Sequence, residues 1–306
     1  MRKATTRRAI TFFELLVILA ILGLLLALLI PAVARVRGAA NRMTSSNNLK
    51  QMALACHNYH DTYNHFPPGN DKNNFSAAAY LLPFIEQANL YNQIDFKKSI
   101  ADDANSASRQ VAIKIFLSPQ DPQTTVNKYG ATNYLFNAGS NPSLDDNNGI
   151  FYQDSKIRIT DVLDGTSNTT MICETLKGDG QNRAVTVQRQ YVVLKARDAL
   201  EKLNDQSGVK EWKANKDIRG DRCASWMDGR FLQGTYTATR EANSMKPDVA
   251  VDGGYGGLSS MRTLSDVLNC AFCDGSVHAI RVKIDPKVWK LLSSRADGQV
   301  INSDDF

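Results

Sequence analysis

The chain has 306 residues, of which 43% are hydrophobic and 22% are charged, and this composition excludes an intrinsically disordered protein. At roughly 150 residues per domain, the length corresponds to about two structural units. The net charge is +5, and four basic residues lie within the first nine positions: Arg2, Lys3, Arg7 and Arg8. Without that leader the charge is +1, so the remainder lacks the clustered positive charge that binding to nucleic-acid phosphates requires.

A long apolar run follows the basic leader. Leu15–Ile30 contains no charged residue, and in the longer segment from Ile10 to Ala34 only Glu14 is charged. As a helix this segment is about 37 Å long, enough to cross a hydrocarbon core of about 30 Å. The sequence therefore predicts a membrane-spanning helix over residues 10–34.

A cleaved secretory signal peptide is the main alternative, because it has the same basic start and apolar run. A small-residue cleavage site is available at Ala32-Val33-Ala34. Glu14 argues against it, since an ionised group costs about 2.5–3.5 kcal/mol near the centre of a span and usually has a partner there. A signal peptide gains nothing from such a group.

The helical pattern also continues beyond Ala34. Apolar and aromatic residues recur at spacings of three and four, as on one face of a helix: Leu49, Met52, Ala53, Cys56, Tyr59, His60 and Tyr63. We therefore expect one helix over residues 10–64, amphipathic over 35–64, which ends before the Phe66-Pro67-Pro68-Gly69 segment. Gly23 and Pro31 are expected to bend this helix without ending it.

The N-terminal segment resembles bacterial type IV prepilins and the related pseudopilins of secretion systems. Their signature is a basic leader, a small residue at the cleavage site, and a hydrophobic helix with glutamate as the fifth mature residue. The resemblance implies cleavage between Ala9 and Ile10, loss of the leader 1–9, methylation of the Ile10 amine, and a role in assembly for Glu14. The chain departs from the signature at Ala9, where glycine is usual, and at Ile10, where phenylalanine is usual.

Further motifs resemble one large prepilin-like family whose head domain has no known function. They are Asn47–Gln51, His57–Tyr63, Phe66–Gly69, Leu82–Gln87, Leu90–Ile94, Asp164–Thr169 and Phe272–Val277. Members typically end with a histidine, nine residues and Asp-Gly, but Leu264 stands in place of that histidine. Ser45 and Ser118 occupy positions where relatives often have cysteine.

The head, residues 65–306, is predicted to be α+β and built on an antiparallel sheet. Asp164-Gly165 and Asp274-Gly275 are expected to form turns. A helix pair is expected around Pro83 and a closing helix at Val288–Leu292. The predicted strands are Val111–Leu117, Thr169–Glu174, Val185–Val193, Leu268–Cys273 and Val277–Val282. The charged segment of residues 195–222 is expected to be a surface insertion that presents a partner surface.

Several side-chain groups suggest chemistry, but each has a simpler structural interpretation. His57, His60 and His65 are close enough in sequence for a metal site, although a polar cluster packed at the helix end is favoured. Cys270 and Cys273 lack the second pair of a zinc ribbon, so buried thiols or bonds to Cys223 or Cys173 are expected. Asp145 and Asp146 are weak calcium candidates, and a solvated turn is favoured because the EF-hand spacing is absent.

No catalytic template matches the chain, so we expect no enzyme, no cofactor and no metal. In particular, Gly253–Gly257 lacks the lysine of a phosphate-binding loop and is interpreted as a flexible turn. The resemblance implies a subunit of a type IV pilus-like or type II secretion pseudopilus-like filament. It also implies a single-pass inner-membrane location with the head outside the cytoplasm, or on a surface filament. The implied partners are the membrane, a prepilin peptidase and other pilin-like subunits, with no nucleic acid. Two alternatives stay open: a membrane-tethered ligand-binding protein that does not polymerise, and a plain secreted protein.

Overall fold

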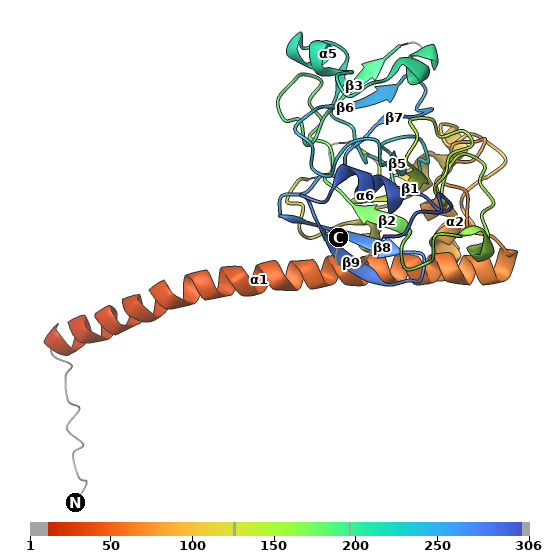
Figure 1. Cartoon of the computed structure of the whole chain (residues 1–306). Helices are drawn as coiled ribbons and strands as arrows, with labels where there is room; N and C mark the ends of the chain where they lie inside the picture. The colour runs from red at the N-terminus through yellow and green to blue at the C-terminus, as the bar shows by residue number, and fades with distance from the viewer. Residues whose placement is uncertain (1–11, 125–126, 196, 302–306) are drawn as a thin grey trace, which may run out of the picture. The chain divides into compact units, whose positions relative to one another are not determined.

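The structure is a computed structural model that describes residues 12–124, 127–195 and 197–301. A long helix, α1 (Phe12–Tyr63), is followed by short helices and two β-sheets (Figure 1). The α+β class predicted from the sequence is confirmed. The chain divides into two compact units between Met43 and Thr44, so that α1 contributes to both.

In the first unit, α1 is a helix whose side chains are exposed at every position from Phe12 to Ala40. Gly23 and Pro31 lie inside the helix and neither of them ends it. Among the described residues, α1 is the one helix long and apolar enough to cross a membrane. A membrane anchor and a signal sequence both meet that description.

In the second unit, one face of α1 is buried, at the spacing that the sequence predicts. The buried side chains are Ser45, Leu49, Met52, Ala53, Ala55, Cys56 and Tyr59. All of them except Ser45 pack in one hydrophobic cluster with residues of the head that include Phe66, Phe151 and Trp226. Because a strip of large apolar residues must be covered, this half of α1 is part of the folded head.

The first sheet has five strands in the order β5-β1-β2-β8-β9. Their bounds are β1 (Tyr134–Gly139), β2 (Thr170–Glu174), β5 (Thr235–Thr237), β8 (Val267–Phe272) and β9 (Val277–Arg281). Three of the pairings are antiparallel, whereas β1 pairs with β5 in parallel.

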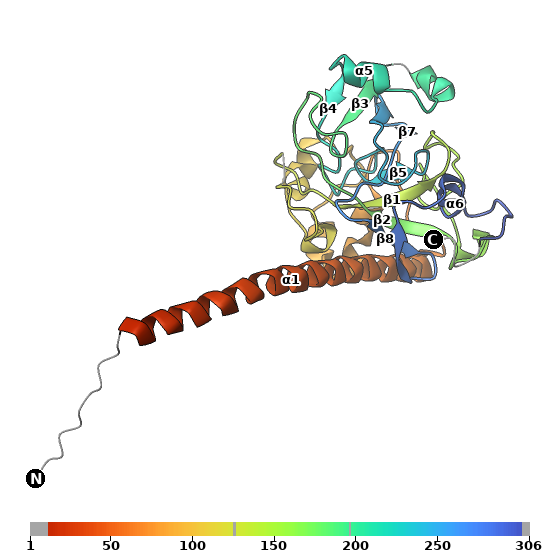
Figure 2. The ribbon, with the colours of Figure 1, turned by 60° about the vertical axis from the view of Figure 1, so that its left-hand side comes forward.

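The second sheet has four short strands in the order β4-β3-β6-β7, and Figure 2 shows β4 beside β3. Their bounds are β3 (Tyr191–Leu194), β4 (Ile218–Arg219), β6 (Asp248–Val251) and β7 (Gly257–Leu258). Here β3 and β6 run parallel. Antiparallel pairing predominates in the head, as the sequence predicts, and one parallel pair in each sheet, β1–β5 and β3–β6, makes both sheets mixed.

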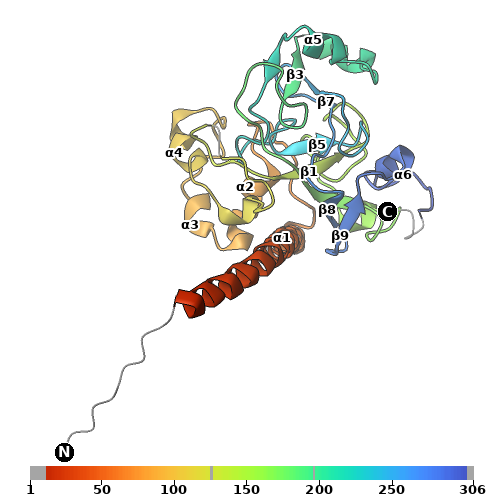
Figure 3. The same cartoon turned by 90° about the vertical axis from the view of Figure 1, so that its left-hand side faces the viewer.

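Short helices connect the strands. The α-helices are α2 (Ala77–Leu81), α3 (Ala88–Tyr91), α4 (Ser106–Arg109), α5 (Val209–Lys213) and α6 (Pro286–Leu291). The 3-10 helices are Leu82–Ile85, Asp103–Asn105, Lys114–Phe116, Ile159–Asp161 and Arg197–Lys202. In Figure 3, α2, α3 and α4 lie on one side of β1 and α6 lies on the other. The expected helix pair around Pro83 and the closing helix are both present.

Two of the predicted strands are wrong, for local reasons. Val111–Leu117 contains a 3-10 helix instead, with Ile113 and Phe116 buried three residues apart. In Val185–Val193 only the last three residues belong to β3. The side-chain oxygen of Gln190 accepts hydrogen bonds from the backbone of Val185 and Thr186, so these N–H groups bond to a side chain instead of a neighbouring strand.

Candidate functional site

The residues of the predicted assembly site are only partly within the described structure. Ala9 and Ile10 lie outside the described residues. Glu14 lies in the first turn of α1 as described, followed by the exposed apolar side chains that continue through Ile30.

The predicted turns of the head do meet one another. Asp274 and Cys273 donate backbone hydrogen bonds to the carbonyl oxygens of Thr166 (3.0 Å) and Thr169 (2.9 Å). The Asp164-Gly165 and Asp274-Gly275 turns thus belong to one packed cluster. The Asp164 carboxylate also accepts hydrogen bonds from the backbone of Asp297 (2.6 Å) and Gly298 (2.8 Å), so it positions the chain after α6.

The predicted hairpin turn of residues 273–275 is present, and it contacts α1. Gly275 has a φ of +78°, a conformation that glycine adopts without strain because it has no Cβ atom. The Asp274 carboxylate accepts a hydrogen bond from the Ser276 backbone (2.8 Å). The ammonium group of Lys50 on α1 donates to the Gly275 carbonyl. The family motifs therefore converge on a structural junction between α1 and β8–β9.

The three clustered histidines pack against aromatic rings at the end of α1. The rings of His57 and His60 lie 5.8 Å and 5.0 Å from that of Phe66, and His65 lies 5.9 Å from Tyr59. The Nε2 atom of His60 accepts a hydrogen bond from the Ile159 backbone (3.2 Å). Among the described residues, no group of three or more His, Cys, Asp or Glu is arranged to hold a metal ion.

The weak calcium candidates, Asp145 and Asp146, lie in an exposed turn. The neighbouring Asn147 is buried, and its side-chain amide forms hydrogen bonds within the same loop. It donates to the Asn141 carbonyl (2.9 Å) and accepts from the Asn148 backbone (2.8 Å). The residues of this turn thus make the contacts of an ordinary solvated turn.

One of the expected cysteine bonds is present. Cys173 and Cys270 form a disulfide between registered positions of β2 and β8. The other three cysteines, Cys56, Cys223 and Cys273, are buried thiols. Burial raises the pKa of Cys223 to about 11, so this thiol is a poor nucleophile.

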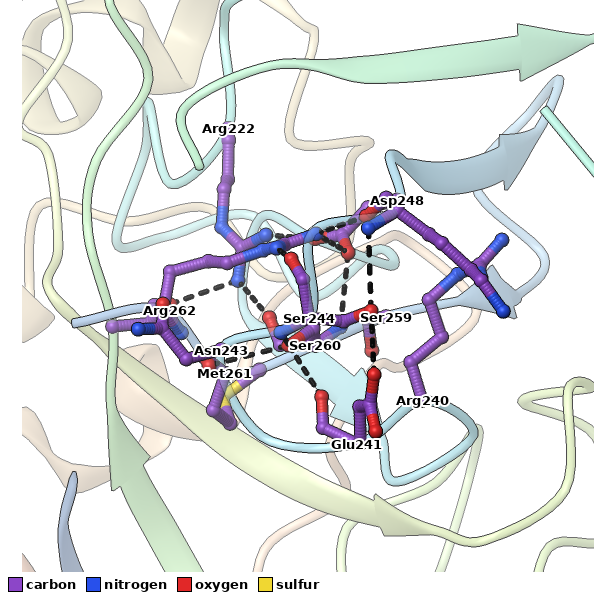
Figure 4. Close-up of polar contacts among 12 residues, drawn as sticks. Arg222, Arg240, Glu241, Asn243, Ser244, Asp248, Ser259, Ser260, Met261 and Arg262 are labelled. Carbon is purple, nitrogen blue, oxygen red and sulfur yellow. Dashed lines mark hydrogen bonds and ion pairs between the residues drawn. The ribbon is translucent and has the colours of Figure 1, made fainter. Parts of the chain in front are cut away.

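A buried ionic cluster joins the two sheets, and sequence reasoning missed it (Figure 4). Both side-chain oxygens of Asp248, at the start of β6, are bound by arginines, Arg222 and Arg262, with all three side chains fully buried. Arg222 also donates to the hydroxyl of Thr175, the residue after β2 (2.8 Å). Arg222 lies in the segment 195–222, which was expected to be a surface insertion. The end of this segment is buried from Ile218 onward, apart from the exposed Arg219 and the half-buried Asp221, so the prediction is wrong for these residues.

A small cavity of about 170 Å³ opens beside the second sheet. It is lined by polar residues that include Arg219, Asp221 and Arg230, and by the Gly253-Gly254 turn. A side chain at Gly254 would approach Arg230 to 2.8 Å, so the turn needs glycine for packing as well as for its positive φ. Within this lining, the Tyr191 hydroxyl donates to Asp221 (2.7 Å).

Of the comparisons with known proteins, one identifies a family for most of the chain. No curated protein and no solved structure matches the chain. A model of the family described as a protein of unknown function, DUF1559 (SBP_bac_10), matches residues 34–287. Because that match covers most of the chain, the protein belongs to the DUF1559 family, carrying an apolar N-terminal helix in front of the family's head domain.

Proposed function

We propose that the chain is an assembly subunit of a type IV pilus-like or pseudopilus-like filament, processed by a prepilin peptidase between Ala9 and Ile10. The observation that carries this proposal is Glu14, the one charged residue in an otherwise apolar segment from Ile10 to Ala34. The basic leader before it and the length of α1 support the same function.

The proposed mechanism follows from the cost of an unpaired charge in hydrocarbon. Cleavage before Ile10 would expose a new α-amine four residues ahead of Glu14, a spacing that corresponds to about 6 Å along the axis of an α-helix. In a low-dielectric medium a carboxylate recovers much of its desolvation cost by pairing with an ammonium group. The Ile10 amine of a neighbouring subunit supplies that group, so Glu14 sets the register of the incoming helix.

The apolar side chains of α1 then hold the filament core together. Leu15, Leu19, Leu22, Leu26 and Leu29 are each about half exposed in the single chain. Because lipid is as apolar as these side chains, close packing between helices rather than the hydrophobic effect would drive their association. Methylation of the Ile10 amine, which the resemblance implies, keeps its positive charge and preserves the ion pair.

Substitution of Glu14 tests this function. Glu14→Val is expected to leave membrane insertion intact and to abolish filaments, whereas Glu14→Asp retains a carboxylate and part of the assembly. The exposed acid Glu201, in the head, provides a control, and Glu201→Val is expected to assemble normally. Normal filaments from Glu14→Val would contradict the proposal.

A second candidate function is a membrane-tethered protein that binds a ligand and does not polymerise. The observation that favours it is the polar cavity beside the second sheet, lined by Arg219, Asp221 and Arg230. Crosslinking between the N-terminal helices of neighbouring chains distinguishes the two functions. A membrane pool that stays strictly monomeric would favour the tether.

A further inference from the structure

Three buried polar side chains meet where β1 and β2 are paired. Asn133 is the residue before β1, Lys177 follows β2, and Asp121 lies in the loop after the 3-10 helix of residues 114–116. Each of them is at most 7% exposed. The Thr175 backbone donates to the Asn133 carbonyl (2.7 Å), which extends the β1–β2 pairing to this point. A lysine amine and an asparagine amide are thus enclosed together with a carboxylate.

The amine and the amide are in direct contact. The Nζ atom of Lys177 donates to the Oδ1 atom of Asn133 at 2.9 Å. A C=O bond is about 1.23 Å long, so the amide carbon lies no more than about 4.1 Å from that nitrogen. The Nδ2 atom of Asn133 donates to the Asp121 carboxylate (2.8 Å) and to the Thr175 carbonyl (2.9 Å), which fixes the orientation of the amide.

A single carboxylate oxygen reaches both nitrogen atoms. The Oδ2 atom of Asp121 lies 3.5 Å from the Lys177 amine and 2.8 Å from the Asn133 amide nitrogen. Arg189 donates to the other oxygen of Asp121 at 2.8 Å and holds the carboxylate in place. Burial alone would raise the pKa of Asp121, but hydrogen bonds from Arg189 and the Lys177 backbone outweigh it and lower the pKa. Asp121 is therefore ionised, and its Oδ2 atom is placed beside the Lys177 amine as a proton acceptor.

A backbone donor faces the amide oxygen. The Ser118 N–H donates to the Oδ1 atom of Asn133 at 3.0 Å. This is the place where negative charge develops when an amine adds to the amide carbon, so the N–H group stabilises the tetrahedral intermediate. The cluster thus contains a nucleophile, an electrophile, a proton carrier and an oxyanion donor.

We propose that Lys177 and Asn133 join in an intramolecular isopeptide bond, formed by the folded chain itself. Asp121 takes a proton from the Lys177 ammonium group, and the freed amine adds to the amide carbon of Asn133. The bond between that carbon and Nδ2 then breaks. Asp121 carries the amine's two surplus protons in turn to the departing nitrogen, which leaves as ammonium. The new amide nitrogen keeps one proton, and the reaction needs no oxidant, reductant or co-reactant.

The bond would complete a covalent path across the first sheet. The isopeptide joins the ends of β1 and β2, and the Cys173–Cys270 disulfide joins β2 to β8. Three adjacent strands are then cross-linked, one link being resistant to reducing agents. A head in a filament under tension would gain mechanical strength from such a path, but the bond forms whether or not the chain polymerises.

Mass spectrometry of the purified, reduced and denatured chain tests the proposal. The expected mass is lower than that of the uncrosslinked chain with the same N-terminus by one ammonia molecule. A protease that cleaves after lysine should leave Lys177 uncleaved and yield one branched fragment containing both residues. A full mass with free Lys177 would overturn the proposal. Loss of ammonia with separate peptides would also overturn it, because a succinimide at an asparagine releases ammonia too.

Variants identify the roles of the three residues. Lys177→Met, Asn133→Ala and Asp121→Ala should each restore the full mass. Lys50→Met is the matched control, since Lys50 donates to the Gly275 backbone carbonyl rather than to a side-chain amide, and it should keep the mass deficit. If a variant fails to fold, the unsubstituted chain still decides the question. A mass deficit that persists in folded Lys177→Met would assign the ammonia loss to another residue and contradict the bond.

Discussion

The ammonium group of Lys50 donates a hydrogen bond of 2.6 Å to the carbonyl oxygen of Gly275, and so ties α1 to the turn between β8 and β9. The contact joins two motifs that lie far apart in the sequence. Through this contact the Asn47–Gln51 motif and the Phe272–Val277 motif build a junction that fixes the head on the second half of α1.

Two glycine-to-alanine substitutions should differ in their cost, because Gly275 is required for its backbone conformation and Gly69 for a close packing contact. Gly275→Ala places a side chain at φ +78°, where the added carbon has ordinary contacts, and we expect a loss of about 1–2 kcal/mol in the free energy of unfolding. At Gly69 the added carbon would lie 2.0 Å from the Phe151 carbonyl oxygen, so Gly69→Ala should lose more. Denaturant unfolding of both variants checks the order, and equal losses would contradict it.

The buried ionic cluster should be sensitive to loss of its one carboxylate. Asp248→Asn leaves Arg222 and Arg262 buried without a counter-charge, and we expect a loss of about 3–5 kcal/mol in the free energy of unfolding. The pair of Arg158 and Asp161, whose side chains are 64% and 33% exposed, is the control, and Asp161→Asn should change stability little. Thermal and denaturant unfolding measure both, and a tolerant Asp248→Asn would contradict the assigned role.

His57 should make the head less stable in mild acid. Burial and the nearby His60 lower the pKa of His57, with Asp61 and Asp274 acting in the opposite direction. The folded state therefore binds the proton less readily than the unfolded state. Above the unfolded pKa of about 6.5, His57 is neutral in both states and costs the folded head no stability. As the pH falls from there through the lower folded pKa, the unfolded state gains the proton first and the free energy of unfolding decreases.

To test the role of His57, the free energy of unfolding is measured at about pH 7 and about pH 5.5 for the unsubstituted chain and for each variant. His57→Gln should lose less stability than the unsubstituted chain between these two conditions. His278→Gln, at an exposed position, is the control and should keep the full difference. An unchanged pH dependence in His57→Gln would show that another group is responsible.

Ser45 and Ser118 should be close enough to be cross-linked when both are cysteine. The Ser45 hydroxyl lies 3.0 Å from that of Tyr134, and the Asn48 amide donates both to that hydroxyl and to the carbonyl of Leu117, the residue before Ser118. In the Ser45→Cys, Ser118→Cys double variant we expect a disulfide after mild oxidation, seen as a mass loss of two hydrogens that reduction reverses. Each single variant is the control. Free thiols in the oxidised double variant would show that the pair is too far apart to bond.

Local sequence patterns predicted the elements that depend on local interactions. The β8–β9 hairpin follows from alternating apolar residues around Asp274-Gly275, and the buried face of α1 follows from helical spacing. The cluster around Asp248 could not be predicted, because Arg222 lies in a sequence segment whose many charges are typical of a surface, and Asp248 is 26 residues away in the sequence. The contact of Lys177 with Asn133 likewise depends on the pairing of β1 and β2.

The most direct test of the central claim is the N-terminal residue of the mature protein, read by sequencing or by intact mass from membranes. Processing as a pilin-like subunit predicts that the chain begins at Ile10, with its amine methylated and the carboxylate of Glu14 retained four residues later. A chain that begins after Ala34 would mean that the apolar segment was discarded as a signal peptide, and it would contradict the proposed assembly function.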